Sequence, residues 1–143
     1  MKKSLILASL IYSSAALSGT GQALIPHYYV GTNSSCHLHI TNISDNDVQV
    51  KIDLFDQNGN TYSSNITSWY AFSGSNPVTS TVALPAKKTG AISMNKMGSG
   101  YVGHGYIRWS NEHNQNDALV ANFHCDATSI GQRSILINQQ SPF

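Results

Sequence analysis

The sequence predicts an all-β protein: a single antiparallel β-sandwich of about seven or eight short strands, preceded by a signal peptide. Short apolar runs alternate with polar residues at a period of two, which is typical of half-buried strands. Clusters of Asn, Asp, Ser, Gly and Pro separate these runs, as expected of turns. No stretch combines a sustained 3.6-residue period with helix caps. A chain of 143 residues accommodates one such domain.

The N-terminus has the pattern of a secretory signal. Lys2 and Lys3 precede a mostly apolar run from Leu5 to Leu17, and Gly21-Gln22-Ala23 places small residues at a cleavage site. We therefore expect residues 1–23 to be a signal peptide and residues 24–143 to form the β-sandwich, secreted or periplasmic. The run is short for a membrane span, so we expect no integral span in the mature chain. An uncleaved N-terminal anchor is the alternative.

The strands are predicted from alternation. The clearest is Val48–Phe55, where Val48, Val50, Ile52 and Leu54 share one face. The other expected strands cover residues 27–30, 36–43, 78–84, 91–95, 106–109, 118–126 and 134–138. Residues 63–77 break the pattern and are expected to form a long polar loop, and residues 97–105 are expected to be a glycine-rich link.

Asp56, Asn58 and Asn60 have the spacing of the start of a calcium loop. The later acidic ligand is missing, and Asn58-Gly59 at a strand end is a common hairpin signal. The segment is therefore interpreted as a turn.

Charge and motifs argue against several functions. Without residues 1–23 the chain keeps six of its eight Lys and Arg against seven Asp and Glu, a net charge near −1. Nucleic-acid binding needs a basic surface, so it is not expected. Glu112 is the sole glutamate, and there is no Gly-x-Ser-x-Gly motif. We therefore expect a protein that is not an enzyme.

The two cysteines allow one disulfide, Cys36–Cys125, as expected of an exported chain. If the two cysteines lie opposite each other on neighbouring antiparallel strands, His37 faces His124 and His39 faces Asn122. These three imidazoles could then bind Zn²⁺ or Cu²⁺. If the disulfide instead joins two packed sheets, the histidines point to opposite surfaces and no site forms. The alternative to metal binding is that the three histidines simply occupy half-exposed strand positions, and in that case no cofactor is expected.

Aromatic residues are the second candidate for binding. Trp69, Tyr70 and Phe72 lie in the predicted loop 63–77, and Trp109 follows the glycine-rich link. Aromatic faces beside Asn and Ser donors suit a sugar ring or a protein partner. The alternative is that these rings fold back into the core of a small domain.

The order of turns and strands resembles that of small bacterial β-sandwich proteins of the sensory rhodopsin transducer type. The similarity covers most of the predicted domain and is carried by four segments: Thr41-Asn42-Ile43-Ser44-Asp45-Asn46-Asp47, Leu54-Phe55-Asp56-Gln57-Asn58-Gly59, Leu84-Pro85-Ala86-Lys87-Lys88-Thr89 and Ala118-Leu119-Val120-Ala121. The resemblance implies a non-enzymatic binding sandwich that forms homo-oligomers.

Together these observations predict an exported, non-catalytic binding or structural module with a protein or glycan partner. The alternatives are a carbohydrate-recognition module that uses the aromatic loop 63–77 and a small metal-binding protein that uses His37, His39 and His124.

Overall fold

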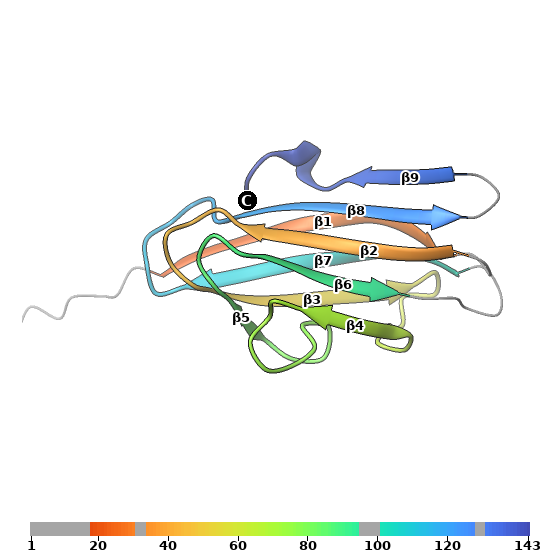
Figure 1. The fold of residues 1–143 in the computed structure, drawn as a ribbon, viewed down its shortest axis with the longest axis horizontal. Coiled ribbons are helices and arrows are strands. Elements are labelled where there is room, and N and C mark those ends of the chain that lie inside the picture. Colours follow the sequence, from red (N-terminus) through yellow and green to blue (C-terminus); the bar gives the residue numbers. More distant parts are fainter. Residues whose placement is uncertain (1–17, 31–33, 95–100, 128–130) are drawn as a thin grey trace, which may run out of the picture.

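The computed structural model describes residues 18–30, 34–94, 101–127 and 131–143. Within these residues the chain forms nine strands in two antiparallel sheets that pack face to face, which confirms the predicted β-sandwich (Figure 1). In the four-stranded sheet the order is β1 (Gly19–Val30), β7 (Tyr101–Asn111), β3 (Val48–Asp56) and β5 (Val82–Leu84). In the five-stranded sheet it is β4 (Ile66–Tyr70), β6 (Thr89–Met94), β2 (Ser34–Asn42), β8 (Leu119–Ala127) and β9 (Gly131–Leu136).

The core lies between the sheets and is built by the predicted alternation. On β3, Val48, Val50, Ile52 and Leu54 are fully buried, whereas the residues between them are partly or wholly exposed. The strand β2 alternates in the same way, with its odd-numbered residues 37, 39 and 41 turned away from the core. Each strand therefore presents one apolar and one polar face, and the polar face of the five-stranded sheet is an outer surface of the molecule.

β1 begins earlier than the sequence indicated. Residues 19–23 pair with residues 111–107 of β7, and Ala23 is buried. Within the described residues the first strand begins at Gly19, and the position after Ala23 lies inside it. Residues 1–17 lie outside the described residues. The indole of Trp109 packs against Gly21, where a Cβ would lie 2.2 Å from the indole nitrogen, so only glycine fits there.

The predicted loop 63–77 contains a strand. Residues 66–70 form β4, which pairs with β6 at the edge of the five-stranded sheet. The polar and exposed residues of this edge strand gave no alternation to detect, because an edge strand needs to bury little side-chain surface.

The described part of the glycine-rich segment is strand. Its residues 97–100 lie outside the described residues, but β7 starts at Tyr101 and runs through Gly103 and Gly105. A Cβ on Gly103 would lie 2.5 Å from the ring of Tyr28, so this glycine makes room for a buried aromatic side chain.

The predicted turn after β3 is observed. One carboxylate oxygen of Asp56 accepts hydrogen bonds from the backbone N–H groups of Asn58 and Asn60, both at 2.8 Å. Gly59 has a φ of 81°, the left-handed conformation that glycine tolerates best. The carboxylate therefore closes the turn.

The described residues contain no helix with the length and apolar character needed to span a membrane.

Candidate functional site

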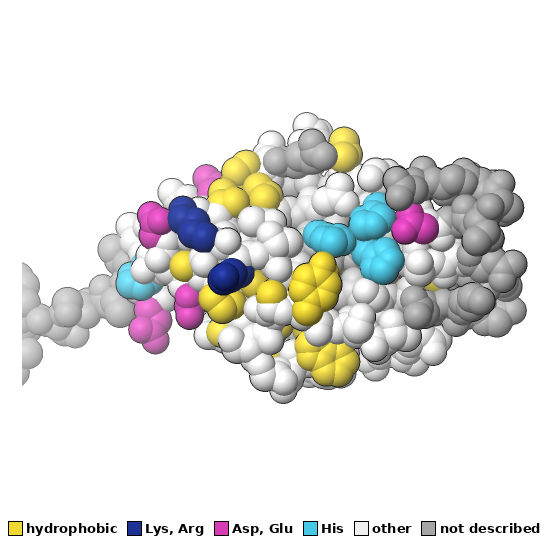
Figure 2. All heavy atoms as spheres, viewed as in Figure 1, with side chains coloured by type: hydrophobic (Ala, Val, Ile, Leu, Met, Phe, Trp, Pro, Cys, Tyr) yellow, Lys and Arg dark blue, Asp and Glu magenta, His cyan; other side chains and the backbone are white. Residues whose placement is uncertain are grey.

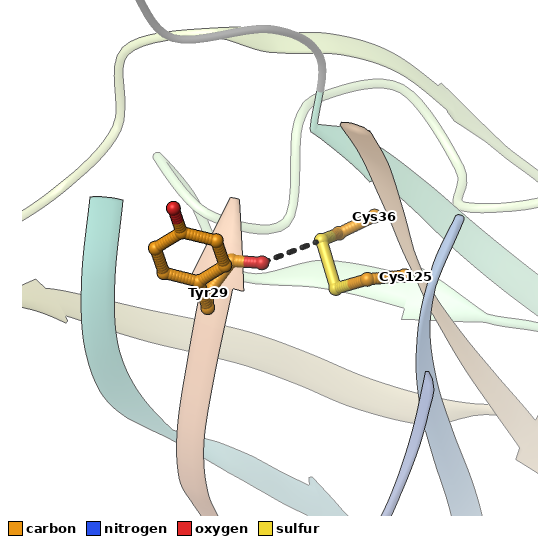
Figure 3. The surroundings of a disulfide bond; sticks show 3 residues. All are labelled: Tyr29, Cys36 and Cys125. Carbon is orange, nitrogen blue, oxygen red and sulfur yellow. Dashed lines mark hydrogen bonds between the residues drawn. A yellow bond between two sulfur atoms is a disulfide. The ribbon is translucent and has the colours of Figure 1, made fainter. Parts of the chain in front are cut away.

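The predicted disulfide is present and joins neighbouring strands of one sheet. Cys36 on β2 lies directly opposite Cys125 on β8, with 4.0 Å between their Cα atoms (Figure 3). Cys36 Sγ also lies 3.5 Å from the carbonyl oxygen of Tyr29 on β1. A disulfide sulfur carries no proton, so this last approach is a contact between the two sheets rather than a hydrogen bond.

This adjacency brings the three predicted histidines together. His37 is directly opposite His124, and His39 is opposite Asn122. The ring of His124 contacts both of the others, with its centroid 5.1 Å from that of His37 and 5.2 Å from that of His39. On the outer face of the five-stranded sheet, Figure 2 shows a group of histidine side chains with an acidic side chain at its edge.

Asp126 is a further member of this cluster that the sequence analysis missed. Ligand atoms of His37, His124 and Asp126 all lie within 4.8 Å of one another. Oδ1 of Asp126 is buried and has no hydrogen-bond partner among the described residues. The signal was present in the sequence, because His124 and Asp126 are two residues apart and so share a face of the strand. The shared face of His124 and Asp126 indicates a metal site only once His37 is placed opposite His124.

Ser93 on β6 orients one of the imidazoles. Its Oγ lies 3.0 Å from Nδ1 of His37. When Nδ1–H donates to Ser93, Nε2 is the unprotonated nitrogen and is free to bind a metal. Such hydrogen bonds fix the tautomer and orientation of metal-binding histidines.

The surroundings of His39 favour its neutral form. The pKa of His39 is lowered from its usual value of 6.5, first by burial and then by the neighbouring His124 and His37. Neutral imidazole is the form that binds metals, because a protonated ring has no lone pair to donate.

We call His37, His39, His124 and Asp126 the histidine face. Two imidazoles and a carboxylate within reach of one centre match the ligands that Zn²⁺ uses, and imidazole also suits Cu²⁺. An unpartnered, buried carboxylate oxygen is costly unless a cation or a donor approaches it. The residues present therefore fit a divalent transition metal.

The four aromatic candidates do not form one group. Trp69 and Tyr70 on β4 are 42% and 52% exposed. Phe72 is buried, and its ring covers Gly90. Trp109 is buried in the core as part of the other sheet. Phe72 and Trp109 thus have the core-filling role that was the alternative interpretation, and the two exposed rings lie at the edge of the sheet that carries the histidine face.

Tyr70 lies close to that face. It is opposite Ala91 on β6, and Ala91 is in turn opposite His39 on β2. Tyr70, Ala91 and His39 therefore form one row across the outer surface, in which the small alanine separates the two rings. Ala91 is only 1% exposed although it faces outward, as expected of an alanine between two large side chains.

Comparisons with known proteins identify no relative: no family model, no curated protein and no solved structure matches the chain.

Proposed function

We propose that the protein is an exported, non-catalytic β-sandwich module that binds a divalent transition metal, Zn²⁺ or Cu²⁺, on its histidine face. The observation that carries the proposal is the convergence of His37, His124 and Asp126, whose ligand atoms lie within 4.8 Å of one another. The unpartnered Oδ1 of Asp126 supports it, since a metal would supply the partner that this inaccessible oxygen lacks.

Export is supported by two features. The N-terminal residues have the composition of a signal peptide. The Cys36–Cys125 disulfide is typical of proteins that fold in an oxidising compartment. Cell fractionation of a host that expresses the full chain tests this part, with recovery in the cytosolic fraction as the contrary result.

Metal binding is tested by isothermal titration of the purified, chelator-treated protein with ZnCl₂ and with CuSO₄. We expect one ion per chain and a dissociation constant below about 100 μM, which corresponds to roughly 5.5 kcal/mol of binding free energy. His124→Ala should weaken binding at least about tenfold, since it removes the central ligand. His113→Ala is the matched control, because His113 is exposed in the segment after β7.

Two results would contradict the proposal. One is wild-type binding weaker than about 100 μM for both metals. The other is equal loss of affinity in the His124→Ala and His113→Ala variants, which would indicate nonspecific binding to histidines.

Carbohydrate recognition is a second candidate, favoured by the exposed Trp69 and Tyr70 at the sheet edge. Exposed aromatic rings stack on the apolar faces of sugars. A glycan array with Trp69→Ala and Tyr70→Ala tests it, with Tyr29→Ala as control because Tyr29 is equally exposed (51%) on the other sheet. Selective loss of signal in the two β4 variants would support the idea, and absence of any glycan signal would exclude it.

A further inference from the structure

We propose that a shallow groove on the outer face of the four-stranded sheet binds an acidic sugar, a ring that carries both hydroxyl groups and a carboxylate. The groove has a volume of about 470 Å³. Polar side chains of β1, β3 and β7 line it, among them Thr20, Gln22, Gln49, Lys51, Arg108 and Ser110. These strands belong to the sheet that does not carry the histidine face, so the inference is independent of the proposed metal site.

Two positive charges face each other across this groove. Lys51 on β3 is directly opposite Arg108 on β7, and both point outward because their neighbours along each strand are buried. Like charges directly opposite on neighbouring strands are unfavourable. Asp53, two residues along β3, forms an ion pair with Arg108 and offsets one of the two charges.

The second charge has no such compensation among the described residues. Lys51 forms no ion pair with them, and no residue that lines the groove is acidic. A bound carboxylate would supply the missing negative charge. The groove therefore favours an anionic ligand over a neutral one.

Both cations are held in place and still have donors to offer. Lys51 Nζ donates to the carbonyl oxygen of Val78 at 2.6 Å. Arg108 Nε donates to Oε1 of Gln22 at 3.0 Å, and its Nη1 donates to Asp53. A guanidinium has five N–H donors and an ammonium has three, so each keeps donors for a ligand. Charged groups that are already positioned lose little entropy on binding.

Neutral polar groups around the two cations point to a sugar rather than a bare anion. The amides of Gln22 and Gln49 and the hydroxyls of Thr20 and Ser110 can each donate and accept hydrogen bonds, as sugar hydroxyls require. The side chains of Gln49 and Ser110 make no hydrogen bond to any other residue that the structure describes. The volume of the groove is also that of a small-molecule site, much larger than a single small ion needs.

The test is an NMR titration of the full sandwich with glucuronate and galacturonate, in the presence of a chelator. Glucose and galactose are the matched neutral sugars, because they have a hydroxymethyl group in place of the carboxylate, and inorganic phosphate is the bare anion. We expect at least one uronate to shift amide resonances of β1, β3 and β7 around the groove. It should bind about tenfold or more tightly than its neutral counterpart and than phosphate, since only the uronate uses both the cations and the neutral groups.

Two pairs of variants locate the site. Gln49→Glu adds a carboxylate to the groove without removing any hydrogen bond, and its charge lies beside Lys51, so the fold is kept while uronate affinity falls by about tenfold or more. Gln57→Glu makes the same charge change in the exposed turn after β3 and should leave affinity unchanged. Lys51→Gln should likewise weaken binding, and its control is the exposed Lys88→Gln.

Three results would overturn the inference. The first is the absence of shifts with either uronate. The second is equal binding of a neutral sugar or of phosphate. The third is the same loss of affinity in Gln57→Glu as in Gln49→Glu. None of them bears on the histidine face, whose metal titrations use a different sheet and different variants.

Discussion

Asp126 combines two opposite effects at the residue scale. Its buried Oδ1 has no hydrogen-bond partner among the described residues, which costs free energy in the metal-free protein. A carboxylate oxygen of the same side chain lies within 4.8 Å of ligand nitrogens of two histidines, where a metal would use it. A side chain that weakens the empty fold and strengthens the loaded one is expected at a binding site.

We therefore predict opposite effects of Asp126→Asn on stability and on binding. Without metal, the neutral amide should raise the free energy of unfolding by about 1 kcal/mol, because an amide oxygen costs less than a carboxylate oxygen to leave without a hydrogen-bond partner. Zn²⁺ affinity should fall by about tenfold or more. Urea unfolding in the presence of a chelator and calorimetric titration measure the two effects. A variant that is less stable without metal would show that the carboxylate has a favourable role in the empty protein.

The lowered pKa of His39 predicts how stability depends on pH. Burial, His124 and His37 all disfavour the protonated form in the folded state, and the unfolded chain therefore takes up this proton at a higher pH. Asp126, the acidic member of the histidine face, lies two residues beyond His124 on the side away from His39.

The stability of the metal-free protein should consequently fall as the pH drops below about 6.5, the usual value for histidine. His39→Gln should make this dependence less steep, since one of the three interacting imidazoles is gone. Urea unfolding between pH 8 and 5, with a chelator present, checks the prediction. Equal slopes for the variant and the wild type would contradict it.

At the scale of elements, β1 is the strand whose boundary matters most. Its first five residues pair with β7 and cover the buried Trp109 through Gly21. Their contribution to the sandwich is visible in the burial of Ala23, which is 4% exposed.

A chain that begins at Leu24 should therefore be less stable than one that begins at Gly19. We expect a loss on the order of 2–4 kcal/mol, because part of the β1–β7 ladder is missing and apolar surface around Trp109 is uncovered. Tryptophan fluorescence during urea unfolding measures the difference. Equal unfolding midpoints would show that residues 19–23 add nothing to the sandwich.

The elements that the sequence predicted well are those with one buried face. β2, β3 and β8 alternate because their inner residues fill the core, so a period of two was visible in each. β4 and the full length of β7 were missed for different reasons. β4 is an exposed edge strand, and β7 carries a glycine, Gly103, that fits against Tyr28 where a core side chain would normally stand.

On the scale of the whole molecule, the disulfide links two segments that lie 89 residues apart. Closing so long a loop in the unfolded chain lowers its entropy, which stabilises the fold by up to about 4–5 kcal/mol in the chain-entropy model. The bond also crosses the β2–β8 ladder beside His37 and His124 and so reinforces the register of the histidine face.

The double substitution of Cys36 and Cys125 by alanine should lower the free energy of unfolding by about 2–4 kcal/mol. Metal affinity should change much less, because nine pairs of residues between β2 and β8 hold the register without the disulfide. Urea unfolding and zinc titration of the same sample provide both values. A large loss of zinc affinity in a folded variant would show that the bond, not the ladder, positions the histidines.

The fold class, most strands and the pairing of the two cysteines could be predicted from the amino-acid sequence, because they depend on local alternation, on turn residues and on there being one possible disulfide. The sequence also showed which histidines share a face of their strand. It left open whether Cys125 lies beside Cys36 or across the core, and with it whether a site exists.

Only the tertiary structure decided that question. Which strands become neighbours, and in which register, depends on packing between segments that are far apart in the chain, and periodicity within one strand carries no information about its neighbour. The adjacency of β2 and β8 places His37 opposite His124, brings Asp126 to the cluster, and lets β6 supply Ser93. The histidine face is thus made of residues that the sequence displays but that long-range strand pairing alone assembles.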